Sequence, residues 1–182
     1  MRTVLLVCHA NTCRSVMAQV LLEKMLDERH ARSRVLVRSG GIANHARDGM
    51  IPSLDARIVL REDGIHLGED EITSTDLRRH RELIAEAHLI VTMTEQQKEM
   101  LAVYEEAHGR PIFTLKELAG EEGDIHDPFQ QGEDRYRACR DEIKRCLTKS
   151  VDRLLATLSG GPGAHAPFFI PLPPGRDFLN PS

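Results

Sequence analysis

The sequence predicts an α/β fold in which a single four-stranded parallel sheet carries helices on both faces. Short apolar segments alternate with longer segments of helical periodicity, the pattern typical of such sheets. The length of 182 residues suits one domain with a full-sized core. The hydrophobic share of 41% and the charged share of 29% are ordinary for a soluble globular protein.

The chain opens with a predicted strand, a tight loop and a helix. Residues 3–7 (TVLLV) predict a buried strand, and residues 8–14 lack apolar periodicity and predict a loop. From Ser15 the apolar residues recur at helical spacing, and the Ser15 hydroxyl is expected to cap this helix. Ligands of parallel sheets bind at the carboxyl ends of the strands, so Cys8, directly after the first strand, is expected at a ligand site.

The remaining segments continue the alternation. Strands are predicted over residues 34–38, 88–93 and 111–115, and helices over residues 52–63, 83–87, 95–106 and 133–158. The second strand is expected to end at Ser39-Gly40-Gly41. Residues 119–132 are rich in Gly, Asp and Glu and predict a long, functional loop. Residues 1–158 are expected to form the domain, and residues 159–182 a Pro/Gly-rich flexible tail.

Charge and composition restrict the partners. The formal net charge of −4 lacks the basic balance of a nucleic-acid binder, so no nucleic-acid partner is expected. No apolar run approaches the roughly 20 residues of a membrane helix, and no secretory signal opens the chain, so we expect a cytoplasmic protein without a membrane partner. In that reducing compartment the four cysteines are expected to be free thiols. The oligomeric state stays open.

Residues 8–15 (CHANTCRS), the Cys8–Ser15 loop, combine the groups that cysteine-based phosphate chemistry needs. Successive backbone N–H groups of such a turn form an anion nest, to which the helix N-terminus adds partial positive charge. Arg14 supplies a planar fork for two phosphate oxygens. These positive surroundings favour the thiolate of Cys8, to which Ser15 can donate a hydrogen bond. The loop is expected to bind a tetrahedral dianion above a nucleophile.

The leaving group of such a reaction needs a proton, and Asp127 is the predicted general acid. It precedes Pro128 in the long loop, and it could later activate water against a phosphocysteine. Asp124, three residues earlier, is the alternative. This chemistry needs no cofactor, and the absence of Cys-x-x-Cys and His-Glu-x-x-His patterns predicts no metal site.

These residues resemble the low-molecular-weight protein tyrosine phosphatase family. That family carries a cysteine, five residues, an arginine and a serine or threonine near its start, and Asp-Pro-aromatic before its last helix. Here those motifs are the Cys8–Ser15 loop and Asp127-Pro128-Phe129, and the resemblance covers about residues 1–157. It implies a phosphatase domain over residues 1–158 that hydrolyses phosphorylated protein side chains through a phosphocysteine, without a cofactor.

The resemblance also implies residue roles. Cys8 is the nucleophile, Arg14 the phosphate ligand, and Asp127 the acid and later the base. Asn11 holds the loop in its unusual conformation through Ser39, and Phe129 forms a wall of the substrate cleft. Phosphate and substrate binding falls to His9, Ala10, Asn11, Thr12, Cys13, Ser15 and Phe129. Cys13 matches a loop cysteine that can form a protective disulfide with the nucleophile, and a purely structural Cys13 is the alternative.

Two positions depart from the family pattern. Ala10 stands where glycine is usual, and Val16 where proline is usual. If the loop requires a positive φ at Ala10, the methyl group costs free energy there. These departures keep open a phosphate-loop binding module with little turnover.

Thr12 bears on the substrate. Tyrosine-specific members usually carry a branched aliphatic residue at this position, whereas bacterial protein arginine phosphatases carry threonine. Residues 114–118 and 123–129 also resemble that subgroup. The carboxylates expected to attract a guanidinium are Glu121, Glu122 and Asp124. We therefore favour phosphoarginine, with phosphotyrosine as the alternative.

Arsenate reductase shares the fold and the loop of this family and is a further alternative. It needs additional cysteines for a disulfide relay, and none occurs between Arg14 and Cys139. Cys139 and Cys146 lie on the apolar stripe of the last predicted helix, about 10 Å apart at 1.5 Å rise per residue. A disulfide cannot span that distance, so both are expected in the core.

Overall fold

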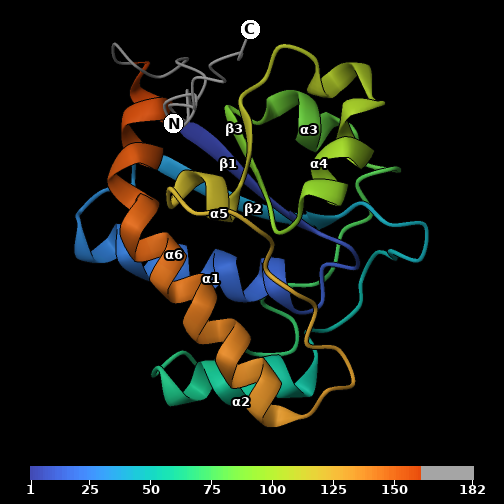
Figure 1. Ribbon diagram of the computed structural model, residues 1–182, viewed down its shortest axis with the longest axis vertical. Coiled ribbons are helices and arrows are strands. Elements are labelled where there is room, and N and C mark those ends of the chain that lie inside the picture. The colour runs from blue at the N-terminus through green and yellow to red at the C-terminus, as the bar shows by residue number, and fades with distance from the viewer. Residues whose placement is uncertain (161–182) are drawn as a thin grey trace, which may run out of the picture.

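The computed structural model describes residues 1–160 and contains one all-parallel sheet with the strand order β2-β1-β3-β4 (Figure 1). The strands are β1 (Arg2–Cys8), β2 (Val35–Gly41), β3 (Leu89–Thr92) and β4 (Ile112–Thr114). Their number and direction confirm the predicted fold class. From residue 161 onward, the predicted tail lies outside the described residues.

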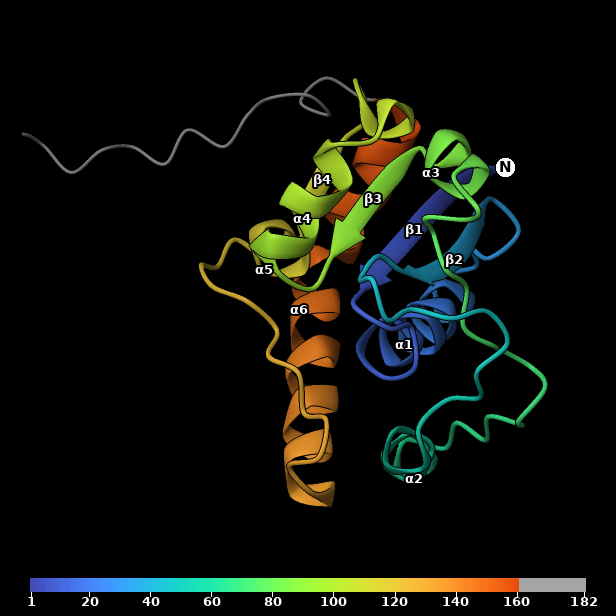
Figure 2. The same cartoon turned by 90° about the vertical axis from the view of Figure 1, so that its right-hand side faces the viewer.

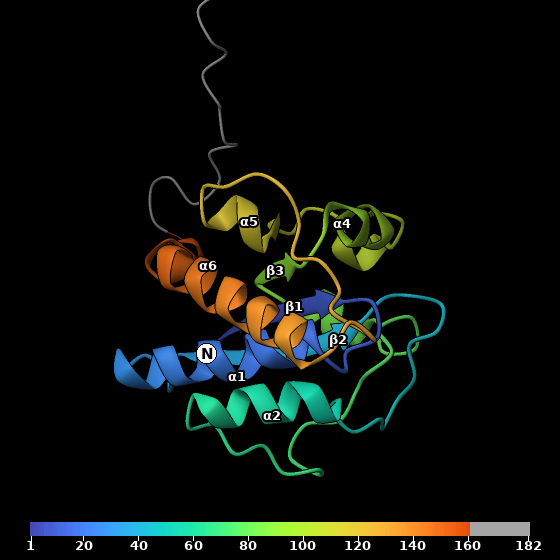
Figure 3. The ribbon, with the colours of Figure 1, turned by 60° about the horizontal axis from the view of Figure 1, so that its bottom comes forward.

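Helices cover both faces of this sheet. The longer ones are α1 (Arg14–Glu28), α2 (Leu54–Glu62), α4 (Glu95–Ala102) and α6 (Glu133–Ser159). The shorter ones are α3 (Glu82–Glu86), the 3₁₀ helix η1 (Glu105–Ala107) and α5 (Leu115–Leu118). The long α6 runs along much of the molecule (Figures 1 and 2), and α2 lies on the outer side of α1 (Figure 3).

Alternate residues of β1 point into two separate parts of the core. Val4 and Leu6 are fully buried among side chains of α1 and α6. Leu5 and Val7 are fully buried on the other face, against side chains of α3 and α4. A strand buried on both faces reads as a continuous apolar run, which explains why residues 3–7 lack polar alternation.

The glycines after Ser39 do not end β2, contrary to the prediction, because the strand continues through Gly41. A Cβ atom at Gly40 would lie 2.5 Å from the Leu77 side chain. A Cβ atom at Gly41 would lie 2.7 Å from the carbonyl oxygen of His9. Both glycines therefore give neighbouring segments room to approach the strand, and Gly41 allows the backbone of the Cys8–Ser15 loop to approach.

Other element boundaries differ from the prediction by a few residues. α2 begins at Leu54 rather than Pro52, because the Ser53 side chain accepts the Ala56 N–H as its N-cap. The predicted helix over 95–106 ends at Ala102, and η1 follows after two non-helical residues. The predicted fourth strand ends at Thr114, whose side chain forms a capping box with Glu117 and starts α5.

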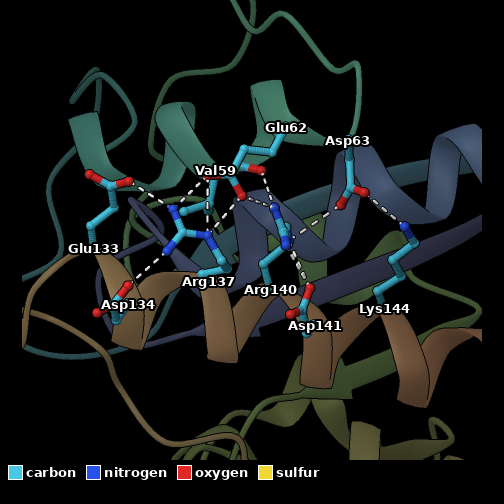
Figure 4. A network of polar contacts seen from close by, with 9 residues as sticks. All are labelled: Val59, Glu62, Asp63, Glu133, Asp134, Arg137, Arg140, Asp141 and Lys144. Carbon is cyan, nitrogen blue, oxygen red and sulfur yellow. Dashed lines mark hydrogen bonds and ion pairs between the residues drawn. The ribbon is translucent and has the colours of Figure 1, made fainter.

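An ion-pair network joins α2 to α6 (Figure 4). Arg140 is buried, and its Nη1 donates to the Val59 carbonyl at 2.6 Å and to Glu62 at 2.7 Å. Arg137 also donates to Glu62, at 2.6 Å from its Nη2. Hydrogen bonds from Arg137, then from Arg140, lower the pKa of Glu62 from 4.5 to about 2. Because the folded-state pKa is depressed, this contribution to stability is complete above about pH 4.5 and is lost as the pH falls towards 2.

Arg140→Met is expected to reduce the free energy of unfolding by about 2 kcal/mol at pH 7, since the Val59 carbonyl loses a charge-assisted donor in a buried position. Urea unfolding followed by circular dichroism measures this. Arg137→Met is the matched control, because Arg137 shares Glu62 but lies nearer the solvent, and its effect should be smaller. A larger effect of Arg137→Met would contradict the assignment of Arg140 as the residue that contributes most to the contact between α2 and α6.

Candidate active site

The Cys8–Ser15 loop connects β1 to α1 at the carboxyl end of the sheet. In Figure 3 it lies at the same end of the molecule as the loop after β2 and the loop before α6. The backbone N–H of Ser53 donates to the Thr12 carbonyl at 2.9 Å, which ties the segment before α2 to it. The site is thus built from segments that lie far apart in the sequence.

The N-terminus of α1 has Cys13 as its N-cap and no side-chain cap. The prediction that Ser15 caps this helix is therefore wrong. The Ser15 hydroxyl instead lies 3.0 Å from the Cys8 sulfur. Since no side chain occupies the first N–H groups of α1, they remain available to an anion together with the helix dipole.

The left-handed residue of the loop is Asn11, with φ of 60°. Ala10 is not among the described residues with positive φ, so its methyl group does not cause the strain that a positive φ would bring. Asparagine tolerates the left-handed region better than most residues do. Alanine therefore fits position 10 of this loop without the strain of a positive φ.

The Asn11 side chain holds three segments together. Its Nδ2 donates to the Ser15 hydroxyl at 2.8 Å and to the Ser39 hydroxyl at 2.9 Å. Its Oδ1 accepts the backbone N–H of Thr75 at 2.9 Å. The expected contact with Ser39 is present, and all of these bonds involve buried or partly buried groups. Asn11 thereby fixes the loop against β2 and the segment that follows α2.

The hydroxyl groups of Ser39 and Ser15 fix the direction of these hydrogen bonds. Ser39 donates its proton to Gln19 Oε1 at 2.6 Å, so its oxygen accepts from Asn11. The Ser15 oxygen likewise accepts from Asn11, which leaves the Ser15 proton for the Cys8 sulfur. The backbone N–H of Asn11 also donates to that sulfur, at 3.3 Å. Two donors thus point at Cys8, the arrangement that a thiolate nucleophile requires.

Arg14 is buried and bridges to the loop before α6. Its Nη1 donates to the Ile125 carbonyl at 2.9 Å. Its Nη2 lies 3.3 Å from His9 Nδ1 and 3.4 Å from Asp127 Oδ2. The guanidinium of Arg14 thus contacts the predicted general acid.

Asp127 and its alternative Asp124 occupy different surroundings. The Asp127 side chain is 49% exposed, and its Oδ1 accepts the Phe129 N–H at 3.1 Å. Asp124 Oδ1 accepts the Glu95 N–H at the start of α4, at 2.9 Å. Asp127 is therefore the carboxylate paired with Arg14. Phe129 is 62% exposed, and its predicted role as a cleft wall stays a prediction.

A pocket of about 300 Å³ lies over this site, lined by His9, Arg14, Thr94, Gln96, Asp124, His126 and Asp127. A larger pocket of about 820 Å³ lies beside it and shares Asp124. The smaller pocket is the one lined by both Arg14 and the candidate acid Asp127. In residues 1–160, no group of three or more His, Cys, Asp or Glu side chains could hold a metal ion.

The other cysteines of the described chain are buried and free. Burial raises the pKa of the Cys13 thiol, and it raises the pKa of Cys139 to about 12. Cys139 and Cys146 lie in the core on α6, as expected, and Tyr136 packs there too. The disulfide between Cys8 and Cys13 stays a prediction.

Glu121, expected to attract a guanidinium, is already paired. It contacts Lys116, Arg145 and Lys149, and hydrogen bonds from Arg145 and then Lys149 lower its pKa to about 2. Of the three carboxylates considered, Asp124 is the one that lines the smaller pocket.

Three supporting residues were missed by the sequence reasoning: Gln19, Thr75 and Gln97. Gln97 carried a signal, because Thr94-x-x-Gln97 is a capping box at the start of α4. Gln19 and Thr75 carried none, since each acts through a contact between segments far apart in the sequence.

Comparison with known proteins agrees with this geometry. Residues 3–159 match the family described as low molecular weight phosphotyrosine protein phosphatase. A protein-arginine-phosphatase of Geobacillus stearothermophilus is 37% identical over 83% of this chain and 95% of its own. One of Bacillus subtilis is 34% identical, with the same coverage. The protein-tyrosine-phosphatase PtpB of Staphylococcus haemolyticus is 32% identical over 79% of this chain and 93% of its own.

Solved phosphatase structures also superpose on this chain. The YwlE arginine phosphatase of Geobacillus stearothermophilus superposes with a TM-score of 0.73 at 33% identity, over 92% of this chain and 99% of that one. A cysteine-to-serine mutant of YwlE with a phosphorylated active-site serine superposes with a TM-score of 0.75 at 32% identity, over 84% of this chain and 95% of that one. The chain belongs to the low molecular weight phosphotyrosine protein phosphatase family.

Proposed function

We propose that the Cys8–Ser15 loop is the active site of a cysteine-dependent protein phosphatase. The chain hydrolyses phosphorylated side chains of proteins through a phosphocysteine intermediate. The observation that carries this is the pair of donors on the Cys8 sulfur, in the same loop as the buried Arg14, whose guanidinium pairs with Asp127. The phosphorylated active-site serine of the YwlE mutant supports a covalent intermediate at the matching position.

In the first step, the phosphoryl group lies in the nest of backbone N–H groups and against Arg14. The Cys8 thiolate attacks phosphorus, so that an S–P bond forms while the bond from phosphorus to the side chain breaks. Asp127 gives its proton to the departing nitrogen or oxygen. Before this transfer, an oxyanion of the bound phosphoryl group displaces Asp127 from Arg14 Nη2. The freed carboxylate takes up from solvent the proton that it gives to the leaving group.

In the second step, Asp127 takes a proton from water, and the water oxygen attacks phosphorus. The S–P bond breaks, and the electron pair returns to the Cys8 sulfur. The Ser15 hydroxyl and the Asn11 N–H stabilise the thiolate as it leaves. Phosphate is released, and no cofactor takes part in this scheme.

The arginine side chain is the phosphorylated group we favour. Two relatives at 37% and 34% identity are protein-arginine-phosphatases. Thr12 is a half-buried residue of the Cys8–Ser15 loop, and its hydroxyl can orient a phosphoramidate or the attacking water. Asp124 and Asp127 line the small pocket and complement the charge of a guanidinium. Phosphotyrosine stays the second candidate, because the PtpB relative is a protein-tyrosine-phosphatase.

The test compares matched peptides bearing phosphoarginine or phosphotyrosine. We expect kcat/KM to favour phosphoarginine by about 10-fold or more, and Thr12→Ile to abolish that preference. Thr73→Ile, at an exposed position, is the matched control and should leave the preference unchanged. A wild-type preference for phosphotyrosine would overturn the substrate assignment and leave the phosphatase assignment standing.

The alternatives receive less support. The cysteines that a reductase relay would need after Arg14 are buried in the core. Ala10 and Val16 kept the binding module open. Ala10 fits the loop without positive φ, and Val16 is fully buried in the core. Residues 1–158 are proposed as the catalytic domain, and the four thiols fit a reducing, cytoplasmic setting. Within residues 1–160, no helix has the length and apolar character needed to cross a membrane.

A further inference from the structure

A glutamine of α4 reaches into the Cys8–Ser15 loop. Gln97 is completely buried, and its Nε2 lies 2.6 Å from Nδ1 of His9. His9 follows the candidate nucleophile directly and lines the small pocket. A buried amide placed against an imidazole constrains which ring nitrogen carries the proton.

The amide of Gln97 is fixed by its own backbone contacts. Its Oε1 accepts the N–H groups of Met93, at 2.9 Å, and of Thr94, at 3.1 Å. The oxygen is therefore committed to the start of α4, and the NH₂ group faces His9. Since an NH₂ group only donates, His9 Nδ1 must accept. The neutral ring then carries its proton on Nε2.

The same nitrogen of His9 faces a second donor, the Arg14 guanidinium. Arg14 Nη2 lies 3.3 Å from Nδ1. An unprotonated Nδ1 accepts from both Gln97 and Arg14, whereas a protonated one would turn its N–H towards two donors. Burial, and after it the positive charge of Arg14, lower the pKa of His9, which keeps the ring neutral near pH 7. Gln97 and Arg14 thus require the same tautomer.

We propose that Gln97 is a positioning residue for the phosphatase reaction, acting through the His9 tautomer to hold the Arg14 guanidinium in place. This inference rests on the proposed function of the site. His9 then presents Nε2–H as a donor within the pocket, and its protonation in acid removes the acceptor that Nδ1 offers to Arg14 Nη2. The other groups that act on His9 are Asp127, His45, Gln96 and, in the pocket, Asp124 and His126.

Gln97→Glu tests this with little change in shape. A carboxylate keeps an oxygen for the Met93 and Thr94 N–H groups, and glutamate also suits the third position of a capping box. Its second oxygen replaces the NH₂ group at His9, which draws a proton onto Nδ1 and removes the acceptor from Arg14. We expect kcat/KM at pH 7 to fall about 10-fold to 100-fold, with the acid limb of the pH profile moved to higher pH.

His9→Ala supplies the background that isolates the mechanism. In that background, Gln97→Glu should have almost no further effect, because the ring that transmits it is gone. A purely structural role of Gln97 would give the same loss with and without His9. That outcome, or an unchanged pH profile of Gln97→Glu, would overturn the inference.

Nitrogen NMR of His9 gives a readout that does not depend on turnover. The wild type should show a neutral ring protonated at Nε2, and Gln97→Glu should show a proton on Nδ1. A wild-type ring protonated at Nδ1 would contradict the inference even if the enzyme is active. An inactive wild type with the expected tautomer would instead contradict the proposed function.

Discussion

Cys8→Ser should lower the turnover of a phosphorylated peptide by about 10⁴-fold or more, the largest single effect expected in this chain. The hydroxyl that replaces the thiol stays protonated near neutral pH and is a poor nucleophile. The loop should keep its shape, because its hydrogen bonds run through Asn11, Ser39 and Ser15 rather than through the sulfur alone. Vanadate or phosphate binding should therefore survive, as measured by calorimetry.

The matched control is Cys146→Ser, which changes a fully buried thiol of α6. It should keep wild-type turnover per folded molecule, although stability falls because a buried hydroxyl is less favourable than a thiol. Near wild-type rates in Cys8→Ser would exclude Cys8 as the nucleophile. Loss of both turnover and anion binding in Cys8→Ser would indicate a collapsed loop instead.

Asp127→Ala should give the second largest effect, a fall in kcat of about 10²-fold to 10³-fold for leaving groups that need a proton. Phosphoarginine and phosphotyrosine peptides both belong to this class. An aryl phosphate with a strongly acidic phenol departs as the anion, so its first step should be slowed much less. A plot of rate against leaving-group pKa for the wild type and the variant measures this difference.

Asp124→Asn separates the two carboxylates. Asp124 accepts the Glu95 N–H at the start of α4, and asparagine keeps an oxygen for that bond. This variant should retain the wild-type dependence on the leaving group. If Asp124→Asn instead showed the steep dependence and Asp127→Ala did not, the acid would be Asp124.

Local signals were sufficient for most of the fold. The strand over residues 3–7 and the apolar stripe of α6 are patterns of burial that a single segment displays by itself. The glycines at the end of β2 misled the prediction. Whether a glycine ends a strand or admits a neighbour depends on what packs against it, and here the neighbours are Leu77 and the Cys8–Ser15 loop.

The site divides in the same way. The sequence was sufficient to predict Cys8, Arg14 and Ser15, because all three belong to one short loop. The residue with left-handed backbone conformation was not predictable. The sequence alone did not reveal that Asn11, rather than residue 10, has the positive φ. Gln97 and Gln19 were missed because their partners lie on segments far away in the sequence. Glu121 was predicted to attract a guanidinium, but its carboxylate is already paired with three cations. Two of these cations lie on α6, which follows Glu121 in the sequence.

The most direct measurement is to trap the covalent intermediate. A phosphoarginine peptide is mixed with the enzyme, the reaction is stopped in acid within the first turnover, and the protein is digested for mass spectrometry. In Asp127→Ala the hydrolysis of the phosphocysteine is slowed. This variant should therefore accumulate the phosphorylated enzyme when an activated aryl phosphate is the substrate. We expect one phosphoryl group on Cys8. A phosphoryl group on His9 or another residue, or turnover with no phosphorylated protein at any time, would contradict it.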